Sequence, residues 1–166
     1  MPRKFKTQLA GQIGEHLVVA ELGRRGVVAT PFSGNVPDID VLAYANGKSV
    51  PIQVKASRAG NISVDAKRYL DIQLDGEKQL IVGKSSDINR NLFFVLVSIG
   101  KKAGEDRFFI YQQGFLQDLI YEKHTGFLKR HGGVRPRNPT STHCAYSIGD
   151  LTEAEGAWSL ILDKLV

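Results

Sequence analysis

Cysteine is nearly absent from this sequence, which holds one cysteine, one methionine and one tryptophan in 166 residues. The single cysteine, Cys144, excludes an intramolecular disulfide and a CxxC zinc site, and we expect a reducing, cytoplasmic compartment. Long apolar runs are also absent. The longest covers the six residues 92–97, far fewer than the ~20 that a membrane helix needs. The basic residues 1–6 precede no apolar stretch, so we expect neither a membrane protein nor a secretory signal.

The size and composition are typical of one folded domain. Hydrophobic residues make up 42% of the chain, which is enough for an ordinary core without disulfides. We therefore interpret residues 1–166 as a single α/β domain. The chain carries 22 Lys and Arg against 17 Asp and Glu, for a formal net charge of +5. Such an excess suits a polyanion such as nucleic acid, because neutralised phosphates release counterions.

Much of the positive charge lies in a basic segment, residues 123–143. From residue 123 to residue 149 the chain has five Lys or Arg and three His with no acidic residue. We expect these cations to contact DNA phosphates, the alternative being an ordinary solvated face. The five cations are Lys123, Lys129, Arg130, Arg135 and Arg137.

Hydrophobic periodicity predicts the order of helices and strands. Leu9, Ile13, Leu17 and Ala20 recur at helical spacing and predict a helix over 8–24 that buries this stripe. Asn46-Gly47 predicts a tight hairpin turn, and residues 33–35 a second turn. The other elements expected are strands over 27–32, 38–44, 50–57, 92–99 and 107–111, short strands over 62–64 and 69–74, and helices over 114–123 and 152–165. Together they predict a central mixed β-sheet with a core β-hairpin flanked by helices.

The C-terminal helix over 152–165 is expected from two signals. Thr152 and Glu155 have the spacing of a capping box. Trp158, Ile161 and Leu165 then fall at helical intervals, so we expect this helix to pack on the sheet.

Charged residues interrupt two strands of the expected sheet that are otherwise apolar. Residues 37–40 read PDID and residues 52–55 read IQVK, one on each strand of the hairpin. Side chains alternate along a strand, so Asp38 and Asp40 would share one face of their strand, and Gln53 and Lys55 one face of the partner strand. If those faces coincide, carboxylate, amide and amine converge. Burying an aspartate and a lysine is costly unless they are paired, hydrogen-bonded or bound to a metal. The pattern therefore favours a functional site here.

These motifs resemble those of the PD-(D/E)XK nuclease superfamily, the restriction-endonuclease-like fold that includes the archaeal Holliday-junction resolvases. The resemblance covers residues 11–57, within core motifs at 8–57. It implies that a helix supplies Glu15, that the second core strand supplies Asp40, and that Gln53-Val54-Lys55 forms the last motif. Spacing in resolvase-like members favours Asp40, which lies 13 positions before Gln53. Asp38, the literal PD residue, stays the alternate.

Gln53 departs from the family pattern, which has Asp or Glu at this position. Mg²⁺ in phosphoryl-transfer sites takes one or two carboxylates together with water and phosphate. The resemblance therefore implies a weaker Mg²⁺ site, in which Mn²⁺ can substitute. The ligands would be the Asp40 carboxylate, the Gln53 amide oxygen and the Val54 carbonyl, with Glu15 restoring negative charge.

The resemblance implies a metal-dependent endonuclease that hydrolyses phosphodiester bonds in DNA, including branched DNA. Its catalytic residues would be Asp40, Gln53, Lys55 and Glu15. The ion would polarise the phosphate and acidify a water that Lys55 orients. Gln8 and Gln12, on the helix face of Glu15, would contact phosphate or sugar. A branched substrate needs two active sites, hence a homodimer.

Two other classes of function stay open. One is a catalytically inactive protein that binds nucleic acid or a partner and keeps the nuclease fold, as Gln53 would allow. The other is a structural or immunity-type module with no role in nucleic-acid binding. The acid-free stretch argues against this last class.

The histidines do not indicate a zinc site. His124, His131 and His143 match no usual ligand spacing, so DNA contact or an ordinary surface position is expected for them. Cys144 stands beside His143, but no orienting acid is near in the sequence. We therefore assign no Cys–His nucleophile.

Overall fold

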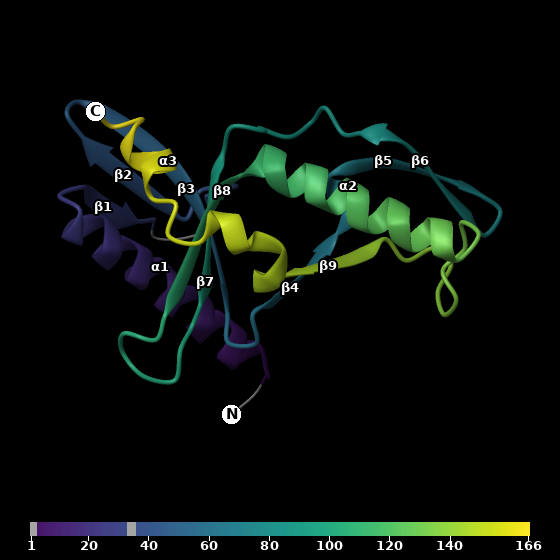
Figure 1. Cartoon of the computed structure of the whole chain (residues 1–166), viewed down its shortest axis with the longest axis horizontal. Coiled ribbons are helices and arrows are strands. Elements are labelled where there is room, and N and C mark those ends of the chain that lie inside the picture. Colours follow the sequence, from purple (N-terminus) through teal and green to yellow (C-terminus); the bar gives the residue numbers. More distant parts are fainter. Residues whose placement is uncertain (1–2, 33–35) are drawn as a thin grey trace. The chain divides into compact units, whose positions relative to one another are not determined.

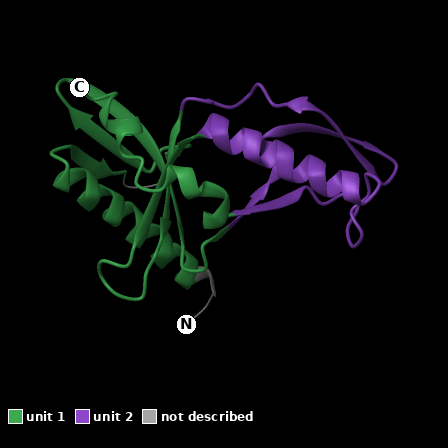
Figure 2. Cartoon of the chain, in the orientation of Figure 1, with its two compact units in different colours: residues 1–61, 92–112, 147–166 green, residues 62–91, 113–146 purple. Residues whose placement is uncertain are grey.

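The computed structural model describes residues 3–32 and 36–166 (Figure 1). The chain forms two compact units, shown in Figure 2. Unit 1 comprises residues 1–61, 92–112 and 147–166, and unit 2 comprises residues 62–91 and 113–146. The turn expected at residues 33–35 lies outside the described residues. No helix in the described ranges is long and apolar enough to span a membrane.

Unit 1 is built on a five-stranded mixed sheet in the order β1-β2-β3-β7-β8. The strands are β1 (Val28–Pro31), β2 (Val41–Ala45), β3 (Lys48–Ser57), β7 (Phe93–Ser98) and β8 (Arg107–Gln112). Only β3 and β7 run parallel; the other neighbouring pairs are antiparallel. The predicted α/β fold, with a central mixed sheet and a core hairpin, is confirmed.

The hairpin of β2 and β3 turns at Asn46-Gly47, as predicted. Both residues have positive φ, 50° and 77°, which is the backbone of a type I′ turn whose twist matches that of the strands. The register that follows pairs Val41 with Ile52. The turn thus fixes which residues of β3 lie beside the start of β2.

α1 (Arg3–Arg24) packs against β1, β2, β3 and β7 (Figure 1). Its buried positions are Gly14, Val18 and Leu22, whereas Leu9 and Ala20 are exposed. The predicted stripe is therefore confirmed for Ile13 and Leu17, which are partly buried against the core, and was wrong for Leu9 and Ala20. The reason is Gly14, where a Cβ would lie only 2.6 Å from the Ala56 Cβ. The helix therefore comes closest to the sheet at this glycine and not at the larger apolar side chains.

The expected C-terminal helix over 152–165 is also wrong. The structure has a 3₁₀ segment, η2 (Ile148–Ala154), and a single-turn helix, α3 (Ser159–Leu162). Between them Glu155 forms a bridge with Phe109, and the Gly156 N–H donates to the Phe108 carbonyl at 2.8 Å. Pairing of this backbone with β8 interrupts the helix, and Gly156 supplies the positive φ of 67° that the break requires.

The capping box lies five residues earlier than the sequence predicts. The Asp150 carboxylate accepts hydrogen bonds from the Ser147 N–H at 2.8 Å and from its hydroxyl at 3.0 Å. Trp158, Ile161 and Leu165 are nevertheless buried in the core. The apolar spacing therefore predicted the packing correctly without a continuous helix.

Unit 2 consists of one long helix with short strands. The elements are β4 (Asn61–Asp65), η1 (Ala66–Arg68), β5 (Leu70–Asp75), β6 (Lys78–Lys84), α2 (Gln113–Arg130) and β9 (His143–Ser147), of which Asn61 and Ser147 belong to unit 1. β5 and β6 form an antiparallel hairpin, and β4 pairs with β9. The predicted short strands and the helix at 114–123 are confirmed, although the helix continues to Arg130. β6 and β9 were not predicted.

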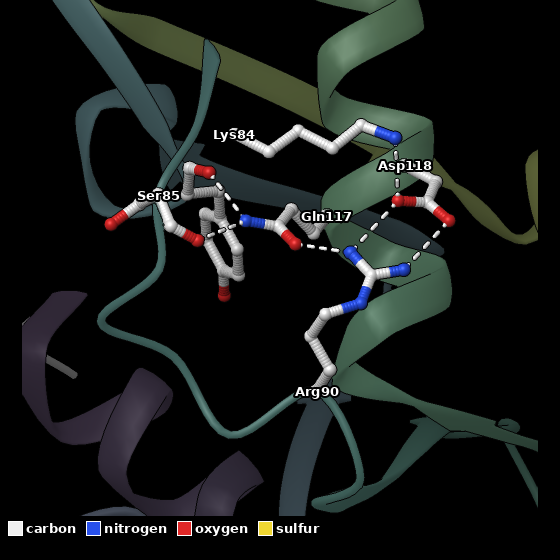
Figure 3. A network of polar contacts seen from close by, with 6 residues as sticks. Lys84, Ser85, Arg90, Gln117 and Asp118 are labelled. Carbon is white, nitrogen blue, oxygen red and sulfur yellow. Dashed lines mark hydrogen bonds and ion pairs between the residues drawn. The ribbon is translucent and has the colours of Figure 1, made fainter.

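A polar network joins the segment at 85–91 to α2 (Figure 3). The buried Gln117 side chain donates from Nε2 to the carbonyls of Tyr69 at 2.9 Å and Ser85 at 2.8 Å. The Arg90 guanidinium donates to Gln117 Oε1 and to both Asp118 carboxylate oxygens, the latter at 3.0 Å. The guanidinium thus connects the end of this segment to the first turns of α2.

His124 lies in the core of unit 2, with 2% of its surface exposed. Gln79 donates from Nε2 to the carbonyls of Pro139 at 2.6 Å and Ser141 at 2.9 Å, so its Oε1 is an acceptor. His124 Nε2 lies 3.0 Å from that oxygen and must carry the proton. The expectation of a DNA-contacting or surface position was wrong for His124, because its ring nitrogen is hydrogen-bonded to Gln79 in the interior of unit 2.

Candidate active site

Asp40 lies just before β2, at the point where β2 stops pairing with β3. Its N–H donates to the Ile52 carbonyl at 2.9 Å, and its Oδ2 accepts from the Val54 N–H at 2.7 Å. β2 pairs with β3 only as far as Ile52, and beyond it β3 continues beside β7. The Asp40 carboxylate therefore binds β3 where a neighbouring strand would otherwise supply the acceptor.

The backbone N–H and C=O groups of Val54 both point toward the side of β3 on which Asp40 lies. In a strand the N–H and the C=O of one residue point to the same edge. Since the Val54 N–H donates to Asp40, the Val54 carbonyl is directed to that same edge. A carboxylate and a peptide carbonyl thus lie on one side of β3.

Glu15 is the second carboxylate of this site. The Glu15 residue is half-buried on α1, and its pKa is raised, first by burial and then by the negative charge of Asp40, while His16 acts in the opposite direction. The preceding residue, Gly14, seats the helix on Ala56 of β3. Close seating of α1 therefore brings two carboxylates within electrostatic reach, which creates a site that favours a cation.

Gln53 and Lys55 lie on the other face of β3 from the side chains of Ile52 and Val54, which join the core that α1 covers. Gln53 is 8% exposed, and within residues 3–32 and 36–166 its side-chain amide has no hydrogen-bond partner. Lys55 is half-buried. Because the Gln53 amide is not among the enclosed atoms that lack a partner in the described residues, it reaches solvent and can bind a ligand.

Asp38 lies in the turn before Asp40. It is exposed and has a φ of 62°, a left-handed conformation that aspartate tolerates better than most residues. Because β2 begins at Val41, the prediction that Asp38 and Asp40 share a strand face was wrong. Asp40 is the one whose carboxylate binds the β3 backbone at Val54.

The predicted nucleic-acid contacts lie on two elements. Gln8 and Gln12 are exposed on α1, seven and three residues before Glu15. The cations of the basic segment belong to α2 and the loop that follows it in unit 2. Of these, Lys129, Arg130 and Arg137 are exposed, and Lys123 and Arg135 are half-buried.

The remaining candidates of the sequence analysis lie in unit 2. His131 and His143 are exposed, as one of the two expectations for them stated. Cys144 is buried, with 8% of its surface exposed.

The donor set at Asp40 contains two carboxylates and neutral oxygens. Among the described residues, no three His, Cys, Asp or Glu side chains form a group that could hold a metal. Mg²⁺ needs only one or two protein carboxylates when water and phosphate complete its shell. Asp40, Glu15 and the Val54 carbonyl are therefore chemically suited to a hard divalent cation, whereas the Gln53 side chain lies on the face of β3 opposite to the core that α1 covers.

The contact that positions Glu15 has almost no signature in the sequence. Gly14 approaches Ala56 so closely that no larger residue fits at either position without movement. The only signal was the pair of small residues, one on the helix and one on the strand. Nothing in their spacing indicated that they meet.

Comparisons with known proteins support the nuclease fold. No family model and no curated protein matches this chain. Among solved structures, the bacterial homing endonuclease I-Ssp6803I is similar, with a TM-score of 0.52 and 14% sequence identity over 95% of this chain and 94% of that chain. At this identity the likeness shows the fold alone.

Proposed function

We propose that this chain is a metal-dependent endonuclease of the PD-(D/E)XK type that hydrolyses phosphodiester bonds in DNA. The observation that carries the proposal is the carboxylate pair. Asp40 binds β3 at Val54, and its charge contributes to the raised pKa of Glu15. The fold that bears this pair is similar to that of a homing endonuclease.

Mg²⁺, with Mn²⁺ as a substitute, is the cofactor that the donor set suits. Asp40 and Glu15 would hold it, together with the Val54 carbonyl. When bound, such an ion supplies Lewis-acid polarisation of the phosphate and acidifies a water. Gln53 brings no charge where the family pattern has a carboxylate, so we expect weaker affinity and not an inactive site.

Lys55 is the cation of the proposed site. It is half-buried on an interior strand, on the face of β3 that Gln53 occupies. An ammonium group is a compact charge with three donors on a flexible stem. Lys55 would orient the attacking water and offset the negative charge that develops on the phosphate in the transition state.

The basic segment and the two glutamines of α1 supply substrate contacts in this proposal. Cations that neutralise phosphates give affinity without sequence preference. Cutting both strands of a duplex or a branched junction would require two copies of the chain. Light scattering of the protein, alone and with DNA, measures that number.

The test is cleavage of three substrates: supercoiled plasmid, linear duplex and a four-way junction. Each is incubated with Mg²⁺, Mn²⁺ or EDTA, with Lys55→Ala beside the wild type. The proposal predicts metal-dependent cutting that the variant loses. The preferred substrate identifies the DNA class. Cutting that persists in EDTA or in Lys55→Ala contradicts it.

A second candidate function is a non-catalytic nucleic-acid-binding protein with the same fold. Gln53 favours it, because the amide removes a negative charge from the donor set, and the described residues hold no cluster of three metal-ligating side chains. This candidate predicts salt-sensitive DNA binding, unchanged in Lys55→Ala, with no cutting by the wild type under either metal.

A further inference from the structure

A second site with the chemistry of an anion pocket lies in unit 2. The C-terminal half of α2 and the start of β9 enclose a pocket of about 410 Å³, a size within the range of ligand sites. Three cations line it, Lys123, Arg130 and Arg135, against one carboxylate, Glu122. The other two cations of the basic segment, Lys129 and Arg137, are not part of its wall.

The two arginines of the pocket keep their charge unneutralised. In the part of the chain that the structure describes, neither Arg130 nor Arg135 forms an ion pair with a carboxylate. Arg90 of unit 2 provides a contrast, since both of its terminal nitrogens donate to Asp118. Guanidinium groups that line a concave wall without forming an ion pair are suited to an anionic ligand.

Arg135 is held in place before any ligand arrives. Its guanidinium carbon lies 4.9 Å from the centre of the Phe127 ring, and its Nη1 donates to the His143 carbonyl. Phe127 in turn stacks on His131, with ring centres 4.3 Å apart. A cation fixed by an aromatic face and a carbonyl loses little side-chain entropy when it binds an anion.

The back of the pocket is buried and electropositive. His124 lines it, and the pKa of His124 is lowered, first by burial and then by the positive charge of Arg135. Gln79 occupies the Nε2 side of its ring. His124 is therefore neutral at pH 7, and the positive charge of the pocket lies on its Lys and Arg side chains, of which Arg130 and Arg135 form no ion pair in the described residues.

Gly126 opens the wall of this pocket. It lies in the interior of α2, where glycine is unfavourable relative to alanine. A Cβ built there would meet only the Arg130 Nη1, at 3.6 Å, so no packing against the rest of the unit demands a glycine. The missing side chain leaves room beside the Arg130 guanidinium.

We propose that this pocket binds one internal phosphodiester group of the DNA strand through Arg130 and Arg135, with Lys123 in support. The proposal rests on the proposed function for the identity of the ligand as DNA. It divides the basic segment into pocket cations, which hold a phosphate by direct hydrogen bonds, and Lys129 and Arg137, which add only long-range attraction.

The test measures binding of a fluorescent duplex by anisotropy in EDTA over a range of salt concentrations, so that cleavage plays no part. Arg130→Ala and Arg135→Ala are compared with the matched controls Lys129→Ala and Arg137→Ala. Loss of a charge-assisted hydrogen bond predicts about tenfold weaker binding. The slope of log affinity against log salt should fall by about one for each pocket variant. The controls should change much less.

Gly126→Ala separates binding from folding. An alanine in the helix interior should raise the thermal midpoint, while its methyl group occupies the space beside the Arg130 guanidinium, 3.6 Å from Nη1, and weakens DNA binding. Inorganic phosphate, titrated with the histidine side-chain resonances as the readout, should shift His143 in the wild type and not in Arg135→Ala.

Three outcomes would overturn the pocket proposal. One is equal loss of affinity in pocket and control variants, which indicates a diffuse basic surface. Another is unchanged DNA affinity in Gly126→Ala. The third is an Arg135-dependent preference for duplexes with 5′-phosphates over those with 5′-hydroxyls, which assigns the pocket to strand ends. If the nuclease proposal alone fails, the pocket variants would still bind DNA more weakly than the control variants, but the wild type would not cut DNA.

Discussion

Gly14→Ala tests whether the seating of α1 on β3 controls the site. The added Cβ would lie 2.6 Å from the Ala56 Cβ and 3.4 Å from the Val54 Cγ1. Carbon atoms pack best at ~3.5–4.0 Å, so the helix or the strand must move by about 1 Å. Overpacking of this kind costs about 1–3 kcal/mol, and the higher helix propensity of alanine returns about 0.5–1 kcal/mol.

The net expectation is a loss of about 1–2 kcal/mol for Gly14→Ala. For a chain of this length each kcal/mol corresponds to about 2–4 °C in thermal midpoint. Gly11→Ala is the matched control, because a Cβ at Gly11 in the same helix meets nothing within 4 Å. That variant should gain about 0.5–1 kcal/mol. Thermal and urea unfolding of both variants measure the difference.

The same displacement should affect chemistry more than stability. A shift of about 1 Å in a catalytic group can reduce the rate about 100-fold, and Glu15 adjoins Gly14. Removing the opposing methyl in Gly14→Ala/Ala56→Gly should restore DNA cleavage, while Gly11→Ala should cut as the wild type does. If Gly14→Ala stabilises the protein as much as Gly11→Ala, the close contact does not exist and the reasoning is refuted.

Three further perturbations test the electrostatics. Asp40→Ala leaves the Val54 N–H without its acceptor and should destabilise the fold by about 1–2 kcal/mol, whereas Asp40→Asn keeps an acceptor and should cost less in urea unfolding; equal losses would contradict the hydrogen bond. Because the pKa of Glu15 is raised, its contribution to stability falls as the pH rises from the ordinary carboxyl range through the raised pKa. Glu15→Gln should therefore raise the thermal midpoint at neutral pH without metal, with no gain in acid, and should weaken Mn²⁺ binding in calorimetry; a variant less stable than the wild type at neutral pH would refute this. Because the pKa of His124 is lowered, the full contribution of this residue to stability is present above its unfolded pKa of about 6.5. That contribution is lost as the pH falls toward the pKa of His124 in the folded protein. His124→Gln should lack that pH dependence in urea unfolding, and an unchanged profile would assign it to another group.

Local signals in the sequence predicted the elements that depend on local chemistry. The Asn46-Gly47 turn and the apolar run of β7 predicted the hairpin and an interior strand, because turn backbone and burial on both faces have direct residue signatures. The IQVK and PDID motifs predicted that Asp40 lies beside β3, where its carboxylate accepts from the Val54 N–H. These features are encoded over a few residues each.

Features that depend on tertiary contact were not predictable. The buried face of α1 follows from the meeting of Gly14 with Ala56 on β3, far away in the sequence. The C-terminal helix breaks because Glu155-Gly156 pairs with β8, a partner that helical spacing does not reveal. His124 is a core residue because Gln79 satisfies its ring nitrogen. In each case a distant partner decided the outcome.

The most direct test of the central claim is cleavage of supercoiled plasmid by the wild type and by Asp40→Asn in parallel, each with Mg²⁺ and with EDTA. Asp40→Asn keeps the shape of the side chain and an acceptor for the Val54 N–H. Near-equal unfolding curves of the two proteins are therefore expected, and they serve as the control for folding. The account predicts Mg²⁺-dependent nicking or linearisation by the wild type and none by the variant. Equal cutting by both proteins, or no cutting by the wild type under conditions in which it binds DNA, would contradict it.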